Sequence, residues 1–150
     1  MKVTFGVRPG SLEDTISGLA GIMINVNNGV KWATEVACAT VYEASVEQVP
    51  KDTYTLAESA FWKVERRTEL SAKSYRYRGI VGYGGNGDPI NPKNGKHASE
   101  YAAEVHEDLS VPHRNGKAKF LEDPLREFAE GGELYRLYLS AVKRGLNRRR

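Results

Sequence analysis

The chain has 150 residues and one cysteine, 40% of its residues are hydrophobic and 27% are charged, and its formal net charge is +3. This length and composition are typical of a soluble single-domain protein, and no apolar run reaches the ~20 residues needed to cross a bilayer. The lone Cys38 excludes an internal disulfide, and the N-terminus lacks the apolar core of a signal peptide, which predicts synthesis in the cytoplasm.

The first fifty residues predict an arm followed by one long helix. Residues 1–10 alternate apolar and polar side chains, which predicts a short strand or an extended arm. From Leu12 an apolar residue recurs every three or four positions, with one missed position at Thr40, which predicts one face of a helix that ends near Val49, before Pro50. The Asn-Asn-Gly sequence at 27–29 interrupts this pattern, so a kink or break there and a continuous helix are both open. The apolar face consists of Leu12, Ile16, Leu19, Met23, Val26, Val30, Ala33, Ala37 and Ala44.

The middle of the chain predicts a small sheet, a loop and a helix. Residues 59–69 and 73–84 mix aromatic and β-branched residues in the alternating manner of two strands. Residues 84–97 are rich in glycine, proline and asparagine and predict a loop that is long for a compact domain. Residues 98–109 return to helical periodicity, with an apolar face made of Ala98, Tyr101, Ala102, Val105 and Leu109.

The final third predicts a loop at 110–119 and a helix that begins near Phe120. Gly131-Gly132 offers a possible break in this helix, and residues 143–150 form a basic tail. The whole chain therefore predicts a single α+β domain. Its long N-terminal helix packs on a small antiparallel sheet, with two further helices near the C-terminus.

The residue types that usually carry chemistry do not converge in this sequence. His97, His106 and His113 lie nine and seven residues apart, which does not suit a metal site. Cys38 is predicted to be a buried inert thiol. The glycines between 79 and 87 lack the phosphate-loop pattern GxxxxGK[ST]. We therefore expect no metal, no cofactor and no enzymatic activity, whether nuclease or peptidase.

Basic residues gather in two places, between Lys63 and Arg78 and in the terminal segment KRGLNRRR. The alternating tyrosines and arginines at 75–78 allow stacking on single-stranded nucleic acid, although a strand that points its tyrosines at the core has the same pattern. The tail suits either DNA phosphates and acidic protein faces or a solvated helix end.

Three segments together resemble a family of tailed-phage proteins. Residues 49–59, VPKDTYTLAES, match the family's "P-x-D-T-G-x-L-x-x-S", residues 101–107 its "Y-A-x-x-V-H-E", and residues 116–124 its "G-K-A-K-F-L-E-x-P". The family is typified by the lambdoid phage gene-product-ten head–tail joining protein. Its members are also described as minor capsid or tail-completion proteins. Tyr54 departs from the pattern, because the family usually has glycine there. The matching residues are Pro50, Asp52, Thr53, Leu56, Ser59, Tyr101, Ala102, Val105, His106, Glu107, Lys119, Phe120 and Pro124.

The resemblance implies a virion protein that forms a sixfold or twelvefold ring in the phage neck. Its partners would be portal, adaptor, stopper or tail-terminator and tail-tube proteins, with DNA passing through the lumen and no membrane involved. Assembly would take place in the bacterial cytoplasm. An adaptor, stopper, tail terminator or minor capsid protein is the alternative within the virion, and a small nucleic-acid-binding module is the alternative outside it. The residues expected at contacts are Asp88, Asn91, Lys93, Arg114, Lys117, Arg148, Arg149 and Arg150.

The motif residues also have expected roles in the fold. Asp52 and Thr53 suit a turn held by hydrogen bonds from their side chains to the backbone, after which Leu56 enters the core. Tyr101 and Val105, one helical turn apart, are expected to pack on the sheet, which leaves His106 and Glu107 pointing outward. Phe120 and Leu121 are expected to anchor the last helix, whose first turn would hold Glu122 and Asp123.

Overall fold

The computed structural model describes residues 11–68, 75–85, 87–110, 112–113 and 115–148. Its elements are α1 (Ser11–Gln48), α2 (Thr55–Glu58), β1 (Phe61–Thr68), β2 (Tyr75–Gly82), α3 (Ala98–Glu107), α4 (Glu122–Glu130) and α5 (Glu133–Asn147). The α+β prediction is confirmed. The predicted N-terminal arm, Arg114, Arg149 and Arg150 lie outside the described residues.

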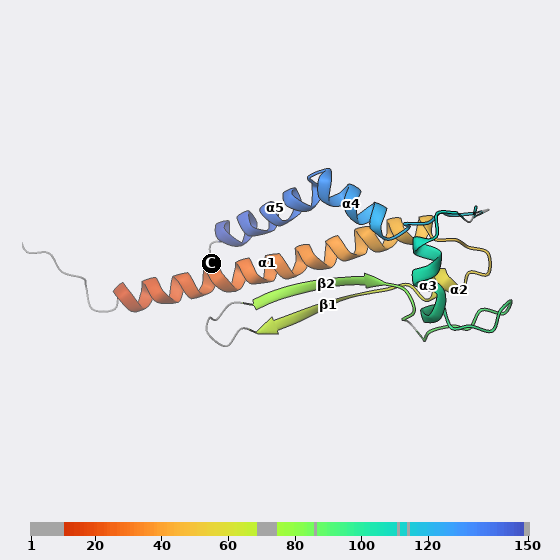
Figure 1. Cartoon of the computed structure of the whole chain (residues 1–150). Coiled ribbons are helices and arrows are strands. Elements are labelled where there is room, and N and C mark those ends of the chain that lie inside the picture. Colours follow the sequence, from red (N-terminus) through yellow and green to blue (C-terminus); the bar gives the residue numbers. More distant parts are fainter. Residues whose placement is uncertain (1–10, 69–74, 86, 111, 114, 149–150) are drawn as a thin grey trace, which may run out of the picture.

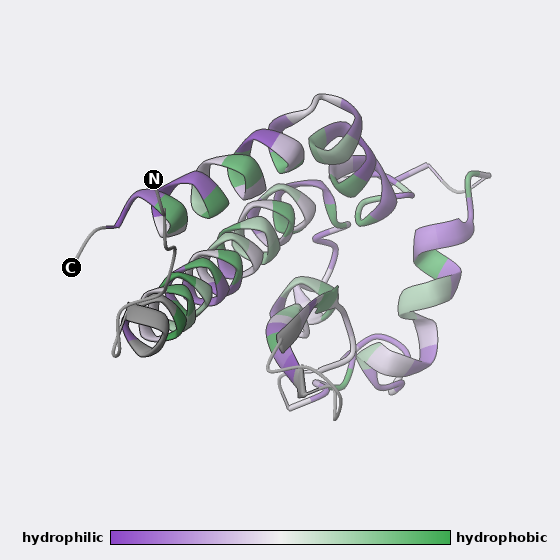
Figure 2. Cartoon of the chain, turned by 90° about the vertical axis from the view of Figure 1, so that its left-hand side faces the viewer, coloured by the Kyte–Doolittle hydropathy of each residue, from purple (hydrophilic) through white to green (hydrophobic). Residues whose placement is uncertain are grey.

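The long helix α1 is the spine of the molecule. The strands lie along one side of it and α4 and α5 along the other, while α2 and α3 gather near its C-terminal end (Figure 1). Figure 2, which looks along α1 from its N-terminal end, shows the same layers. The helix ends at Gln48, so the predicted stop before Pro50 is confirmed.

Helix α1 continues through residues 27–29, which settles the question of a kink. Gly29 lies at the crossing with α5, where a Cβ would stand 2.7 Å from the carbonyl oxygen of Ala141. On the facing helix, a Cβ on Gly145 would stand 2.7 Å from the Cα of Val26. The two glycines therefore let the helix backbones approach closely, and the glycine in the Asn-Asn-Gly sequence serves packing between helices.

The sheet is a two-stranded antiparallel hairpin that packs on α1. Val64 pairs with Gly79, and Gly79 faces α1 so closely that any side chain there would overlap the sulfur of Cys38. Cys38 is buried and free, as expected, and burial raises the pKa of its thiol. Thr34 lies 2.8 Å, oxygen to oxygen, from the hydroxyl of Tyr138 on α5, so α1 is fastened on both sides.

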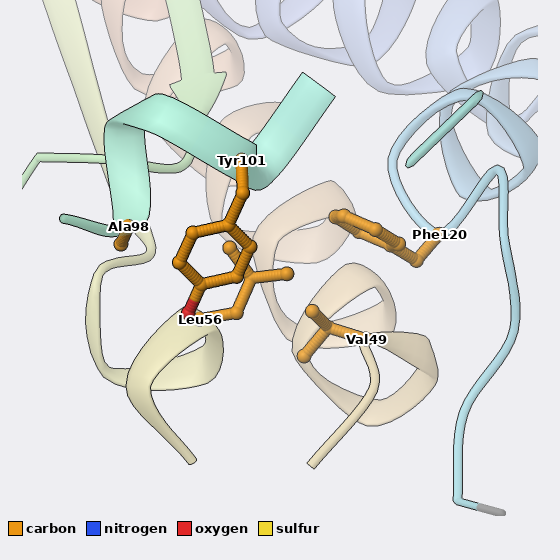
Figure 3. Packing of buried hydrophobic residues seen from close by; sticks show 5 residues of the cluster. All are labelled: Val49, Leu56, Ala98, Tyr101 and Phe120. Carbon is orange, nitrogen blue, oxygen red and sulfur yellow. The ribbon is translucent and has the colours of Figure 1, made fainter. Parts of the chain in front are cut away.

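A hydrophobic core lies at the end of α1. It contains Val49, Leu56, Ala98, Tyr101 and Phe120, which come from four separate parts of the chain (Figure 3). Leu56 and Phe120 are buried as predicted. The expectation that Tyr101 packs on the strands is wrong: it packs between α2 and the end of α1, because the loop before α3 carries that helix past the end of the sheet.

Two helix boundaries and the short helix α2 differ from the sequence-based expectation. Helix α3 ends at Glu107, so Leu109 lies beyond it and is exposed. Helix α4 begins at Glu122, with Phe120 in the turn before it. The possible break in the last helix is real, because Gly132 adopts a left-handed φ of 75° between α4 and α5. The single turn α2 was expected as a turn without a helix.

Candidate functional site

The three motif segments, which are far apart in the sequence, meet beyond the end of α1. The Lys117 N–H donates to the carbonyl of Gln48 at 2.9 Å, which ties the third segment to the start of the first. Gly116 has a φ of 102° and lies against Pro50, where a Cβ would stand 2.6 Å from the proline nitrogen. The motif residues therefore belong to one structural unit.

His106 fastens α3 to the start of α4. Its Nε2 accepts a 3.3 Å hydrogen bond from the Glu122 N–H, so the ring proton is on Nδ1, which lies 2.8 Å from the Glu107 carboxylate. The ring meets Phe120 edge-on, with centroids 5.0 Å apart. Only 16% of the His106 side chain is exposed, so the expectation that it points outward is wrong. Contact with the buried Phe120 ring draws it inward.

Lys119 adds two ion pairs with carboxylates to this contact between α3 and the start of α4, which we call the latch. It ion-pairs with Glu107 and, at 2.8 Å, with Glu122. The hydrogen bond from Lys119 keeps the pKa of the Glu107 carboxyl below its usual range, and the same bond raises the pKa of Lys119. Both shifts favour the charged forms of Glu107 and Lys119. Glu107 is exposed as expected, and the arrangement is one that holds two helices together at the surface.

The first motif segment forms a turn held by its own side chains. The hydroxyls of Thr53 and Thr55 lie 2.9 Å apart. Ser59 donates to the carbonyl of Leu56 at 2.7 Å and accepts from the N–H of Gly84 at 3.1 Å. The Thr53 hydroxyl therefore meets the side chain of Thr55, where a bond to the backbone was expected. Ser59 joins the turn to the loop that follows the sheet.

Tyr54 occupies the position where the family motif has glycine. Its φ of 60° lies in the left-handed region, which glycine adopts without strain. The tyrosine side chain is exposed and meets no steric obstacle. The departure from the motif therefore changes the surface of the turn and keeps a glycine-type backbone.

The loop at 84–97 is built by two of its predicted contact residues. The Asp88 carboxylate accepts hydrogen bonds from the N–H of Ser99 at 2.9 Å and from its hydroxyl at 2.6 Å. The side-chain oxygen of Asn91 accepts from the Lys93 N–H at 2.9 Å. Lys93 ion-pairs with Asp52 at 2.5 Å and is well exposed. Of these three candidates, Lys93 has the most exposed charge, since 62% of its side chain is exposed against 34% for Asp88.

Replacing Asp88 with asparagine is expected to make the protein's stability depend less on pH below about pH 4. Hydrogen bonds from Ser99 hold the pKa of this carboxyl below its usual range, so its stabilisation is present above about pH 4 and is lost as pH falls through the folded-state pKa. Asparagine keeps an acceptor and tolerates the left-handed φ of 44°. The melting temperature of both proteins, measured from pH 7 to pH 3, should converge as the pH falls. Parallel curves would contradict this role.

The motif residues also surround a small hollow, which we call the motif hollow. Its volume is about 210 Å³. The Nε2 of His113 is buried there and has no hydrogen-bond partner among the described residues. Nothing in the sequence indicated this, because the convergence depends on tertiary packing. The hollow is lined by Pro50, Asp52, Thr53, Leu56, Asn91, Asn94, Tyr101, Val105 and His113.

The remaining predicted contact residues lie in two places. Lys117 ion-pairs with Asp123 at 2.7 Å, at the end of the molecule that contains the motif hollow. Arg148 lies at the opposite end, beside the first half of α1. The described contact candidates therefore lie on two separate surfaces, at opposite ends of the molecule.

The second surface is basic and partly aromatic, and the part that Trp32 plays in it was not predicted from the sequence. The Arg144 guanidinium carbon lies 5.4 Å from the centroid of the half-exposed Trp32 ring, beside a hollow of about 710 Å³. Lys143 and Arg148 line the same hollow. A sequence signal existed, because neither 15–34 nor 134–150 contains an acidic residue.

The described residues contain no group of three or more His, Cys, Asp or Glu side chains that could hold a metal ion. The three histidines serve separate purposes: His97 caps the start of α3, His106 belongs to the latch, and His113 lines the motif hollow. No helix among the described residues has the length and apolar character to cross a membrane.

Comparison with known proteins finds no matching family model, curated protein or solved structure.

Proposed function

We propose that the chain is a structural subunit of the neck of a tailed bacteriophage, a ring protein that completes the joint between head and tail. The observation that supports this proposal is the convergence of the three motif segments on one hydrophobic core. The first two segments also line the motif hollow. Matches scattered by chance would have no reason to meet in space. The resemblance to the head–tail joining family therefore concerns a coherent structural unit.

In this role the copies close by rotation into a sixfold or twelvefold ring between the portal–adaptor complex and the tail tube, and DNA passes through the lumen. The motif hollow would receive a side chain or loop of the adjacent ring. The protein acts by contact and carries out no reaction. Adaptor, stopper, tail-terminator and minor capsid roles are the alternatives, and co-purification with capsid-free tails or with tailless heads separates them.

Filling the motif hollow is expected to block joining without unfolding the chain. Asn94 is exposed at its rim, so Asn94→Trp places a large ring at the opening. We expect heads and tails from a phage that carries this gene to join at least ~10-fold less often with the variant, as a loss of about 1.4 kcal/mol of contact energy implies. Electron microscopy of mixed heads and tails counts the joined particles.

The matched control is Thr40→Trp, which places the same ring at an exposed position of α1 that lines neither the motif hollow nor the hollow beside Trp32. Both variants should melt within a few degrees of the parent protein. Equal joining by all three proteins would remove the hollow from the proposal. A parent protein that associates with neither heads nor tails, as judged by multi-angle light scattering and electron microscopy, would overturn the neck role itself.

The basic surface around Trp32 favours a second candidate, a nucleic-acid-binding module. An exposed aromatic ring beside Lys143, Arg144 and Arg148 offers both stacking and phosphate contacts. Such binding would weaken steeply with salt, with a log–log slope of about one per phosphate contact. Tight, salt-dependent DNA binding without any association with phage particles would favour this candidate over the neck.

A further inference from the structure

The apolar face of α1 continues beyond the elements that cover it. From Val26 onward this face packs against α5 and the sheet, whereas the first turns of α1 extend past them (Figure 1). Ile16, Leu19 and Met23 lie on the uncovered part, and their side chains are 58%, 56% and 47% exposed. We call these three residues the ridge. A periodic stripe of this kind is normally covered, and an exposed one marks an interaction surface.

An apolar groove of about 440 Å³ lies further along the same helix. Its floor includes Ala37 and Val41 of α1, and its walls come from β2 on one side and from α4 and α5 on the other. Leu125 in the wall is 50% exposed, which is unusual for a leucine beside a core. Thr34 and Val41 at the bottom of the groove are only 3% and 4% exposed, so apolar side chains from outside would contact its rim around Leu125.

The ridge and the groove lie on one face of one helix. An α-helix completes five turns in about 18 residues, so Ile16 lies in line with Thr34, Leu19 with Ala37, and Met23 with Val41. All three of the later residues line the groove. The two surfaces thus point in the same direction, displaced by about 27 Å along the axis.

We infer that two copies of this chain pair reciprocally through these surfaces. When two α1 helices lie antiparallel and face to face, the ridge of each copy contacts the groove of the other. The twofold axis then passes beside the midpoint of ridge and groove, at about residue 28, and both contacts form at once. Because the interface is isologous, the pair closes and does not continue as a filament.

Charge favours a second copy over other occupants. Residues 122–133 carry five acidic groups and one basic group, whereas residues 134–148 carry four basic groups and no acidic one. In the antiparallel pair, α5 lies on the same side of both α1 helices, so the basic end of one copy comes beside the acidic α4 of the other. This complementarity orients the two chains. DNA would instead leave the three ridge side chains in water.

The contact is independent of the proposed neck role, and its test uses two variants that keep the fold. Leu19→Asp changes the ridge and Leu125→Asp the groove, both at half-exposed positions. We expect multi-angle light scattering to give twice the 16.7 kDa chain mass for the parent protein and the chain mass for each variant. The dissociation constant should rise about 30-fold or more, as for other central interface residues.

Mixing the two variants provides the decisive measurement. The variant with the altered groove keeps its ridge, and the variant with the altered ridge keeps its groove, so one contact can form. An equimolar mixture should therefore give a 1:1 heterodimer that dissociates more readily than the parent dimer. No assembly larger than a dimer should form. The matched control is Ile24→Asp, which is 57% exposed in the same helix but points roughly 110° away from the groove-facing direction.

Several results would overturn the inference. One is a parent protein that stays monomeric at concentrations near 1 mM, where even weak specific pairs form. Others are variants that remain dimeric, a mixture that does not pair, or an Ile24→Asp protein that dissociates as readily as Leu19→Asp. None of these results depends on heads or tails, so the pairing and the neck role can fail separately.

Discussion

Replacing Phe120 with alanine should lower the free energy of unfolding by about 3–5 kcal/mol, the largest loss we expect from one substitution. Phe120 is 1% exposed, and its ring meets Tyr83 edge-on, with centroids 4.9 Å apart, as well as His106. Alanine would leave a cavity among side chains from four parts of the chain. The melting temperature should fall on the order of 10 °C for a protein of this size.

Thermal and urea denaturation measure this loss, and Leu109→Ala is the control. Leu109 is also a large apolar residue near α3, but it is exposed beyond the helix end, so its removal should change stability by about 0.5 kcal/mol or less. If both variants lost the same stability, the cluster around Phe120 would not be the core that holds the three motif segments together.

Gly29→Ala and Gly18→Ala should have opposite effects, although they make the same chemical change in the same helix. At Gly18 an added Cβ would have nothing within 4 Å, so alanine should raise stability by up to about 1 kcal/mol through helix propensity. At Gly29 the new methyl group would stand 2.7 Å from the Ala141 carbonyl oxygen. Overpacking against backbone should cost about 1–3 kcal/mol.

Urea denaturation of the two variants beside the parent protein measures both signs. A stabilised Gly29→Ala protein would mean that α5 moves away from α1 at little cost, and the close crossing would then be unimportant for stability. The pair of variants isolates the crossing, because helix propensity favours alanine at both positions.

The features that the sequence predicted are those encoded by local patterns. The spacing of apolar residues predicts a helical face that runs to the end of α1, although it leaves continuity through 27–29 open, and Pro50 predicts where the helix ends. Leu56 and Phe120 are predicted as core residues from their positions beside turns, and both are buried. The strands followed from β-branched and aromatic alternation, and their observed bounds differ from prediction by one or two residues at each end.

The features that the sequence did not predict depend on which elements meet. Gly29 indicated a possible break because Asn-Asn-Gly is typical of turns. Its packing role depends on α5, which lies more than a hundred residues further along the chain, so local sequence could not reveal it. His106 was expected to point outward because helical periodicity places it off the apolar face, yet Phe120 from another segment draws it inward. The motif hollow and the Trp32 surface likewise arise from residues on separate elements.

Because α1 is continuous, a rotation at one of its ends displaces the other. Its 38 residues form a rod of about 57 Å, with the motif hollow beyond one end and the ridge at the other. The centre of the ridge lies about 43 Å from the end of α1, so a tilt of about 10° at the hollow would move the ridge by about 7–8 Å. A partner that reorients one end is thereby sensed as a large displacement at the other.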